Sequence, residues 1–164
     1  MAVLNVTPDS FSDGGILPAM DRGELRDHAE SLIDAGARLL DIGGESTRPG
    51  ADDVSEEEEC RRVMPVVESL LDLDVAISVD TSKPGVARRA LALGCHMIND
   101  VGGLRHPDML QTLAASRAAI VIMHMRGAPR TMQDNPQYDD VVAEVASYLG
   151  EKVAACRAAG IERE

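Results

Sequence analysis

Polar side chains follow five short apolar runs of the chain, at the point where each run ends. The residues concerned are Asn5, Asp41, Asp80, Asn99 with Asp100, and Met123 with His124. In a sheet of parallel strands the carboxyl ends meet at one edge, where such folds place their active sites. A single Asp after a strand is more often a helix cap. Five polar ends in series favour a binding or catalytic site.

Asp80 and Asn99 are the sharpest candidates among these residues. Asp80 follows the apolar run "AISV", and a carboxylate buried at a strand end must be paired. A ligand edge with two adjacent N–H donors, as in a guanidine-like heterocycle, would bind both of its oxygens. Asn99 can donate and accept hydrogen bonds, which suits recognition of the same heterocycle. The pair therefore predicts a site for a heterocyclic ligand.

Two polar segments extend beyond the first two apolar runs. The first, from Val6 to about Ala19, is longer than a typical connection, and its Ser, Gly and Asp content suits a loop that covers a ligand. The second, 43–53, carries Thr47 and Arg48, a hydroxyl and a guanidinium suited to an anion. Arg48 alone would be interpreted as a surface charge. Beside Thr47, it indicates an anion site.

Other charged residues give weaker signals. His124 has no second His or Cys at metal-ligand spacing, so it is interpreted as a packed or loop histidine. Lys83 and Arg126 are expected to face solvent. The four acids 56–59 are interpreted as a helix N-terminus, where negative charge complements the helix dipole, and not as a functional cluster.

Short apolar runs alternate with amphipathic segments along the whole chain. The predicted strands are Ala2–Val6, Arg38–Ile42, Val75–Val79, His96–Ile98 and Ala119–Met123. The predicted helices run from Asp21 to Ala35, from Ser55, from Ser82 and Pro84 to Gly94, from Pro107, and from Asp139–Asp140 to Ala159. Ser55 and Glu58 have the spacing of a capping box. This alternation predicts an α/β fold with a parallel sheet and right-handed crossovers.

Two architectures fit the alternation: a doubly wound open sheet, or part of an eight-stranded barrel. A dinucleotide-binding open sheet expects the pattern Gly-x-Gly-x-x-Gly after its first strand. Here the first run continues into Asn-Val-Thr-Pro, and no phosphate-binding P-loop pattern occurs in the sequence. The motifs therefore give no support to a nucleotide-binding sheet.

Composition narrows the class of protein. The chain has 164 residues, of which 45% are hydrophobic, enough for one domain with its own core. Its net charge of -12 disfavours nucleic acid or an anionic membrane as a partner. No apolar run could span a membrane, and no signal peptide is evident. Three widely spaced cysteines indicate free thiols in a reducing compartment, which predicts a cytoplasmic protein.

Five stretches of the chain resemble a known family. "LNVTPDSFSDGG" and "LDIGGESTRPGA" are similar to the two signature stretches of dihydropteroate synthase, a pterin-binding enzyme family. "ISVDTSKPGVA", "MINDVGGL" and "VIMHMRGAPRTMQ" follow in the family's order. The resemblance covers nearly the whole chain. It implies a TIM (β/α)8 barrel that condenses a hydroxymethyl-dihydropterin diphosphate with para-aminobenzoate, with Mg²⁺ assisting. The products are dihydropteroate and diphosphate, and the family is a target of sulfonamides.

The resemblance also implies roles for individual residues. Asn5 would help to bind the metal ion and the diphosphate, and Thr47 would contact the diphosphate. Arg48 and Pro49 would border the aminobenzoate site.

On the pterin side, the resemblance implies that Asp80 and Asn99 hold the edge of the heterocycle while Met123 packs on its ring. Asp80, Asn99 and Arg48 would be the catalytic residues. The loop that orders over the site would include Thr7, Pro8, Asp9 and Ser10.

The chain also departs from the family pattern. An eight-stranded barrel takes roughly 250 residues. The family's later motifs, an Asp-Pro-Gly strand end, a pterin-binding Lys, and an Arg and a His for diphosphate, are not found within residues 1–164. We expect about five βα units of one pterin-binding barrel domain, incomplete at the C-terminus and slightly at the N-terminus. The resemblance implies a homodimer for the full-length enzyme and leaves the oligomeric state of this chain open.

Two alternatives remain from the sequence. A methyltetrahydrofolate methyltransferase-like domain would share an Asp and an Asn on the pterin, but would not need "DSFSDGG" or "STRPG". A non-catalytic half-barrel that binds pterin, or that serves in assembly, would belong to a different functional class.

Overall fold

The computed structural model describes residues 1–7, 21–46, 53–127, 131–132 and 135–162. Within these residues five strands alternate with five helices. The strands are β1 (Ala2–Asn5), β2 (Leu39–Gly43), β3 (Ala76–Asp80), β4 (Met97–Asp100) and β5 (Ala119–Ile122). The helices are α1 (Arg22–Asp34), α2 (Glu56–Leu70), α3 (Pro84–Leu93), α4 (Pro107–Ala114) and α5 (Val141–Ala158). The predicted alternation is confirmed.

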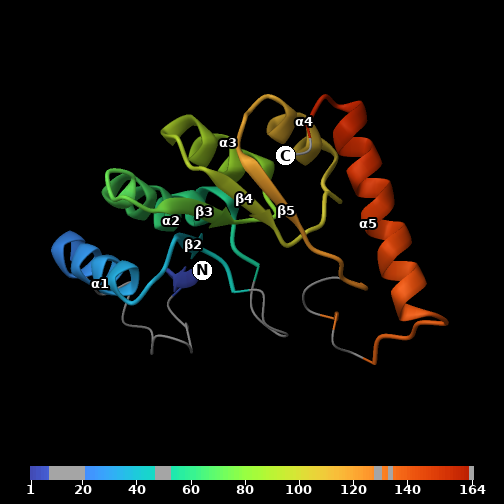
Figure 1. Ribbon diagram of the computed structural model, residues 1–164, viewed down its shortest axis with the longest axis horizontal. Helices are drawn as coiled ribbons and strands as arrows, with labels where there is room; N and C mark the ends of the chain where they lie inside the picture. The colour runs from blue at the N-terminus through green and yellow to red at the C-terminus, as the bar shows by residue number, and fades with distance from the viewer. Residues whose placement is uncertain (8–20, 47–52, 128–130, 133–134, 163–164) are drawn as a thin grey trace.

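The strands form one parallel sheet in the order β1-β2-β3-β4-β5. A doubly wound sheet reverses its strand order at a switch point, and the described strands contain no such reversal. Right-handed crossovers between consecutive neighbours place the helices on one side of the sheet. Figure 1 shows α1 to α4 in an arc around the outside of the strands. The architecture is therefore part of a TIM barrel, as predicted, and the open-sheet alternative is wrong.

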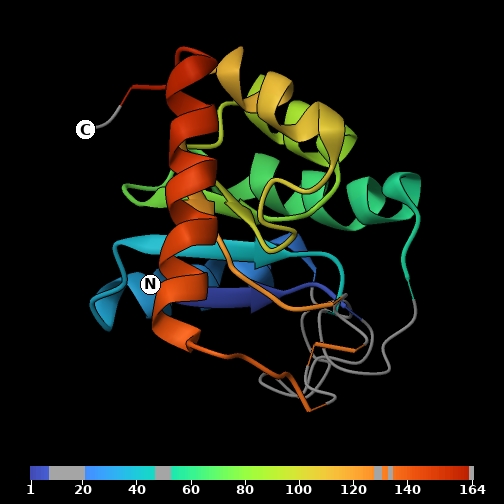
Figure 2. The same ribbon diagram turned by 90° about the vertical axis from the view of Figure 1, so that its right-hand side faces the viewer.

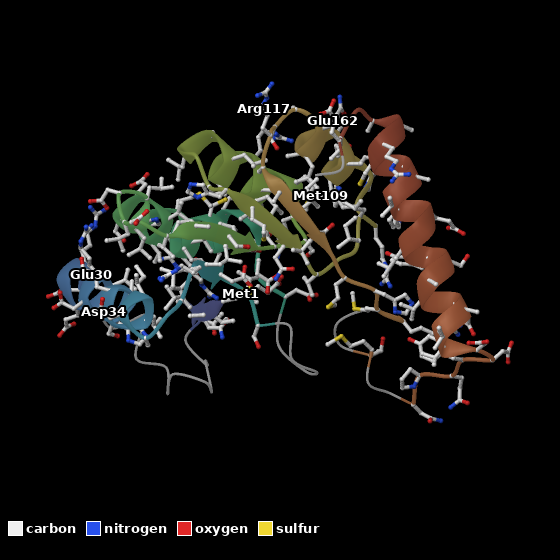
Figure 3. All side chains as sticks on the ribbon, viewed as in Figure 1. Met1, Glu30, Asp34, Met109, Arg117 and Glu162 are labelled. Atoms are coloured by element: carbon white, nitrogen blue, oxygen red, sulfur yellow. The ribbon has the colours of Figure 1, made fainter. Side chains whose placement is uncertain are left out.

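The core lies between the sheet and the helices α1 to α4. Alternate strand residues are completely buried there, among them Leu4, Leu40, Ile42, Ile77, Val79 and Ile98. The side chain of Met109 points from α4 toward the sheet, whereas Glu30 and Asp34 extend outward from α1 (Figure 3). On the opposite face of the sheet, Val3 and Val121 are exposed. Asp41 and Ser78 of the central strands lie on the same face as Val3 but are buried, so this face is exposed at its outer strands and closed at its centre.

The local signals at the helix ends were largely correct. Asp21 forms a complete capping box with Glu24 at the start of α1. At the start of α2, Ser55 Oγ accepts from the Glu58 N–H at 3.2 Å. The predicted box is incomplete, because the Glu58 carboxylate binds Arg62 at 2.7 Å instead of the backbone of Ser55. Helix α3 begins at Pro84 as predicted, but its N-cap is Lys83 and not Ser82.

Helix α5 lies beyond β5 and crosses the strand direction in the view of Figure 2. Two of its side chains bind the turn that follows β4. Tyr148 donates its hydroxyl to the carbonyl of Gly103 at 2.5 Å, and Lys152 Nζ donates to the carbonyl of Leu104 at 3.0 Å. No helix in the described part of the chain is both long and apolar enough to span a membrane.

Candidate active site at the strand ends

Three predicted site residues lie in one row across the sheet. Asn5 of β1 pairs with Gly43 of β2, Gly43 pairs with Asp80 of β3, and Asp80 pairs with Asn99 of β4. Residues in register on parallel strands direct their side chains to the same face. The arrowheads of β1 and β2 point the same way in Figure 2, toward the edge that carries this row. The sequence correctly predicted that these side chains gather at one edge.

Gly43 keeps the centre of this row open. A Cβ atom at residue 43 would lie 3.3 Å from Asn5 Oδ1 and 3.8 Å from Asp80 Cβ. A larger side chain would fill the space between the two polar groups. The absence of a side chain therefore leaves room at the strand ends where a ligand could approach both Asn5 and Asp80.

Asp41 joins the site from within the sheet. It lies two residues before Gly43 on the same strand face, and only 3% of its surface is exposed. Its Oδ2 accepts a hydrogen bond from Asn99 Nδ2 at 3.0 Å. The sequence marked Asp41 as a polar strand end but gave it no role. Its partner is 58 residues away along the chain, and no local pattern predicts such a contact.

Several buried acceptors in this region lack a hydrogen bond within the described part of the chain. They are Asp41 Oδ1, Asp80 Oδ1 and Ser78 Oγ. Buried polar atoms are nearly always satisfied by protein, water or ligand. Ser78 and Asp41 are register partners on β3 and β2, directly below the row that contains Asp80. The site therefore presents a set of acceptors that suits a ligand rich in N–H donors.

Asp80 is an unusually weak acid for an aspartate. Burial raises its pKa to about 7, and the negative charge of Asp41 adds to the effect, followed by those of Glu59 and Asp100. A carboxyl group with such a pKa is present in both protonation states near neutral pH. When ionised, it accepts hydrogen bonds from two N–H donors, and when protonated it can donate one.

Lys83 does not face solvent, and that prediction is wrong. Its Nζ lies 2.6 Å from Glu45 Oε2 and 2.6 Å from Glu59 Oε2. Burial lowers the pKa of Lys83, but the two carboxylates outweigh burial, and the net direction is upward. Burial raises the pKa of Glu59, against the opposing effects of Lys83 and Thr81.

The interpretation of residues 56–59 as acids that only complement the helix dipole is incomplete, because two of them bind groups outside their own helix. Glu59 has no exposed surface, and Glu56 accepts from the Gly85 N–H at 3.0 Å. Two of the four acids thus bind α3 or the residue before it. A sequence signal for Glu59 existed, because it lies four residues before Val63 on the inward stripe of the helix.

The remaining predicted residues divide into those that the structure describes and those that lie outside the described residues. Met123 is half-buried just after β5, and Thr7 is buried after β1. The ring of His124 packs against Tyr148 and Tyr138, with centroid distances of 5.1 and 5.9 Å, as expected of a packed histidine. Arg126 is exposed to solvent, as predicted, and from there it binds Glu144 and covers the Tyr138 ring. Outside the described residues lie Pro8, Asp9, Ser10, Thr47, Arg48 and Pro49.

A parallel sheet in sequential strand order, with carboxylate and amide side chains at its carboxyl edge, places the chain in the α/β-barrel class. Comparison with known proteins makes the assignment specific. The chain belongs to the family described as pterin binding enzyme, whose sequence pattern matches residues 1–164.

Named relatives agree with this family. The dihydropteroate synthase of Escherichia coli K12 is 51% identical over 165 residues, covering 100% of this chain and 58% of that protein. The Yersinia pestis dihydropteroate synthase, solved with a sulfonamide drug, matches at a TM-score of 0.92 and 47% identity, covering 99% of this chain and 58% of that one. The Burkholderia cenocepacia enzyme, solved with 7,8-dihydropteroate, matches at a TM-score of 0.84 and 44% identity. The match covers 99% of this chain and 54% of that one. The chain thus spans between half and three-fifths of these relatives.

Proposed function

We propose that this chain provides the pterin side of a dihydropteroate synthase, which condenses hydroxymethyl-dihydropterin diphosphate with para-aminobenzoate. The observation that carries the proposal is the row of Asn5, Gly43, Asp80 and Asn99 at one sheet edge. Asp80 lies there with a buried oxygen that has no hydrogen bond within the described residues. A pterin carries adjacent N–H donors and ring acceptors, which match a carboxylate beside an amide. The relatives that bind dihydropteroate and a sulfonamide support the same substrate class.

The proposed reaction needs little acid–base catalysis from the protein. Departure of diphosphate leaves an electron-poor methylene carbon on the pterin, and the aromatic amine that attacks it is already neutral at pH 7. The protein must therefore position the two substrates and stabilise the charges that develop. Asp80 and Asn99 hold the heterocycle, and the negative potential around Asp80 favours the developing positive charge. Met123 packs on the ring.

The roles proposed for binding diphosphate and aminobenzoate are taken from the motifs that this chain shares with the family. Thr47 contacts the diphosphate, and Arg48 with Pro49 borders the aminobenzoate. The loop that covers the bound substrates contains Thr7, Pro8, Asp9 and Ser10. Arg48 supplies a cation close to the leaving group, and Asp80, Asn99 and Arg48 act as the catalytic residues.

Magnesium fits this site only together with substrate. Among the described residues, no group of three or more His, Cys, Asp or Glu side chains could hold a metal ion. Asn5 Oδ1 lies 3.3 Å from the position that a Cβ atom at residue 43 would take, and it would provide one oxygen ligand. Mg²⁺ commonly takes one or two protein oxygens and completes its shell with phosphate and water. When bound, the ion would neutralise the departing diphosphate.

We further propose a cytoplasmic enzyme that forms a homodimer at full length, with small molecules as its substrates. All three cysteines are free, which fits a reducing compartment. The net charge of -12 fits neither nucleic acid nor an anionic membrane as a partner.

Calorimetric titration with the pterin diphosphate, with and without Mg²⁺, tests the proposal. We expect binding that Mg²⁺ strengthens and that Asp80→Ala abolishes. The matched control is Asp74→Ala, which changes an exposed Asp just before β3. Absence of heat from a folded wild-type chain would overturn the claim that these residues bind the pterin and would favour a non-catalytic half-barrel. Binding of methyltetrahydrofolate in preference to the diphosphate would favour the methyltransferase-like alternative.

A further inference from the structure

A buried ion cluster lies beside the candidate site and takes no part in the proposed chemistry. It consists of Glu45, just after β2, Glu59 in the first turn of α2, and Lys83, just before α3. Lys83 bridges the two carboxylates with two contacts of 2.6 Å. The Glu59 side chain has no exposed surface, and those of Glu45 and Lys83 are 19% and 22% exposed. We name these three residues the Lys83 cluster.

The cluster costs free energy to form. An ion pair that is removed from water recovers its desolvation penalty only where the geometry is good, and it often adds little to stability. Apolar residues of similar size would serve a purely structural purpose at this position equally well. Loss of the ammonium alone would leave two carboxylates together, one of them fully buried. A role in holding a defined geometry is therefore the better explanation of the cluster.

The Glu45 carboxylate shows which geometry is held. Its Oε2 binds Lys83, and its Oε1 accepts from the backbone N–H of Val54 at 2.8 Å. Glu45 and Val54 are the two ends of the segment 45–54, which connects β2 to α2. The carbonyl of Gly44 is held in addition by Arg62 of α2 at 3.0 Å. Through one side chain, Lys83 thus fixes both ends of this segment.

Lys83 also relates this segment to the pterin side. It lies three residues after Asp80, and Asp80 is the register partner of Gly43, two residues before Glu45. The ammonium therefore connects the chain that leaves β3 with the chain that leaves β2. A shift of Lys83 would move the ends of 45–54 relative to Asp80.

We propose that Lys83 is a positioning residue, which uses Glu45 and Glu59 to set where Glu45 and Val54, the two ends of segment 45–54, lie relative to the pterin-binding Asp80. The inference rests on the proposed function, in which Thr47 and Arg48 of this segment serve the diphosphate and the aminobenzoate. Lys83 contacts no substrate itself. Its effect falls on the alignment of the second substrate with the bound pterin, and much less on binding of the pterin.

Glu45→Gln is the sharpest test, because glutamine keeps the size of the side chain and an oxygen for the Val54 N–H but loses the charge that binds Lys83. Steady-state kinetics of the protein encoded by the complete reading frame should show KM for para-aminobenzoate raised about tenfold. The dissociation constant for the pterin diphosphate should change less than about twofold. Lys83→Met should show the same split, and Lys83→Arg should restore much of the loss. Glu57→Gln is the control, because it changes an exposed acid of α2, the helix that carries Glu59. It should leave the KM for para-aminobenzoate and the dissociation constant for the pterin diphosphate unchanged.

Hydrogen exchange at the Val54 amide gives a readout that does not depend on activity. Lys83→Met and Glu45→Gln should speed exchange there, while the amides of β3 keep their protection. Folded variants with unchanged exchange at Val54, or with both kinetic constants affected equally, would overturn the positioning role. A wild-type enzyme that forms no dihydropteroate, with variants that still lose protection at Val54, would refute the proposed function and leave the anchoring of this segment by Lys83 in place.

Discussion

Asn99 Nδ2 donates a 3.0 Å hydrogen bond to Asp41 Oδ2, and the contact reaches from β4 over β3 to β2. An ionised carboxylate can only accept, so it directs the amide nitrogen of Asn99 toward itself. The amide oxygen of Asn99 is thereby left for donors elsewhere. Asp41 thus determines which polar group Asn99 presents at the strand ends.

Asp41→Asn should lower the pKa of Asp80 from its value of about 7. Burial is the main cause of that raised pKa, and the charge of Asp41 is the next. Asparagine keeps the shape of the side chain and removes the charge. Carbon-13 NMR of the Asp80 carboxyl as a function of pH measures the change directly. Asp74→Asn, at an exposed position, should have no effect, and an unchanged Asp80 pKa in Asp41→Asn would contradict the prediction.

The raised pKa of Asp80 also predicts how stability depends on pH. An Asp in the unfolded chain titrates near pH 3.9, whereas folded Asp80 titrates at about 7. Between these values the folded state binds more protons than the unfolded state, so the free energy of unfolding falls as pH rises. Asp80 alone contributes a loss of at most about 4 kcal/mol across this window.

Urea unfolding at pH 5 and pH 7.5 measures this dependence. Glu59 and Asp100 also have raised pKa values and act in the same direction, so the comparison must isolate Asp80. Asp80→Asn should lose less stability between the two pH values than the wild type. Equal losses in the two proteins would mean that Asp80 does not carry the effect.

The sequence predicted the elements of the fold well because their signals are local. Apolar runs, the Asp21 cap and Pro84 each depend on residues within one or two turns. Strand order is different, since it depends on contacts between elements. The alternation of elements alone therefore left open two architectures. The family resemblance favoured the barrel, and the sequential pairing of β1 to β5 confirmed it.

The site shows the same division. The row of Asn5, Asp80 and Asn99 was predictable, because every parallel strand ends at the same edge. The contacts of Lys83 were not, because Glu59 and Glu45 lie 24 and 38 residues away along the chain. A lysine after a strand is usually solvated, and its burial depends on how α2 packs against β2 and α3.

Gly44→Ala should destabilise the protein by about 1–3 kcal/mol, because an added methyl group would overfill a packed site. A Cβ at residue 44 would lie 2.6 Å from Val63 Cγ2 and 3.0 Å from Glu59 Cγ. Gly150→Ala is the matched control in the exposed middle of α5, with no heavy atom within 4 Å of the new Cβ. It should stabilise the helix by about 0.5–1 kcal/mol. Chemical denaturation of both variants measures the two signs, and a neutral Gly44→Ala would contradict the close packing of β2 on α2.

Tyr148→Phe should loosen α5 from the rest of the fold. The lost hydroxyl donates to the carbonyl of Gly103 at 2.5 Å, and its removal should cost about 0.5–1.5 kcal/mol. Lys152 makes the neighbouring bond to the Leu104 carbonyl, with its Nζ 5.2 Å from the centre of the Tyr148 ring. Because Val141, Val142 and Val153 of α5 are exposed, few apolar contacts compensate for the loss.

Hydrogen exchange resolved by segment checks this prediction. Amides of α5 should exchange faster in Tyr148→Phe, while those of α2 keep their wild-type rates. Tyr138→Phe is the control, since its ring lies beside Arg126 and His124 and does not contact the turn after β4 through any hydrogen bond among the described residues. Cys156 is the buried residue of α5. Unchanged protection of α5 in Tyr148→Phe would mean that Lys152 and Cys156 hold the helix, and that the tyrosine hydroxyl does not.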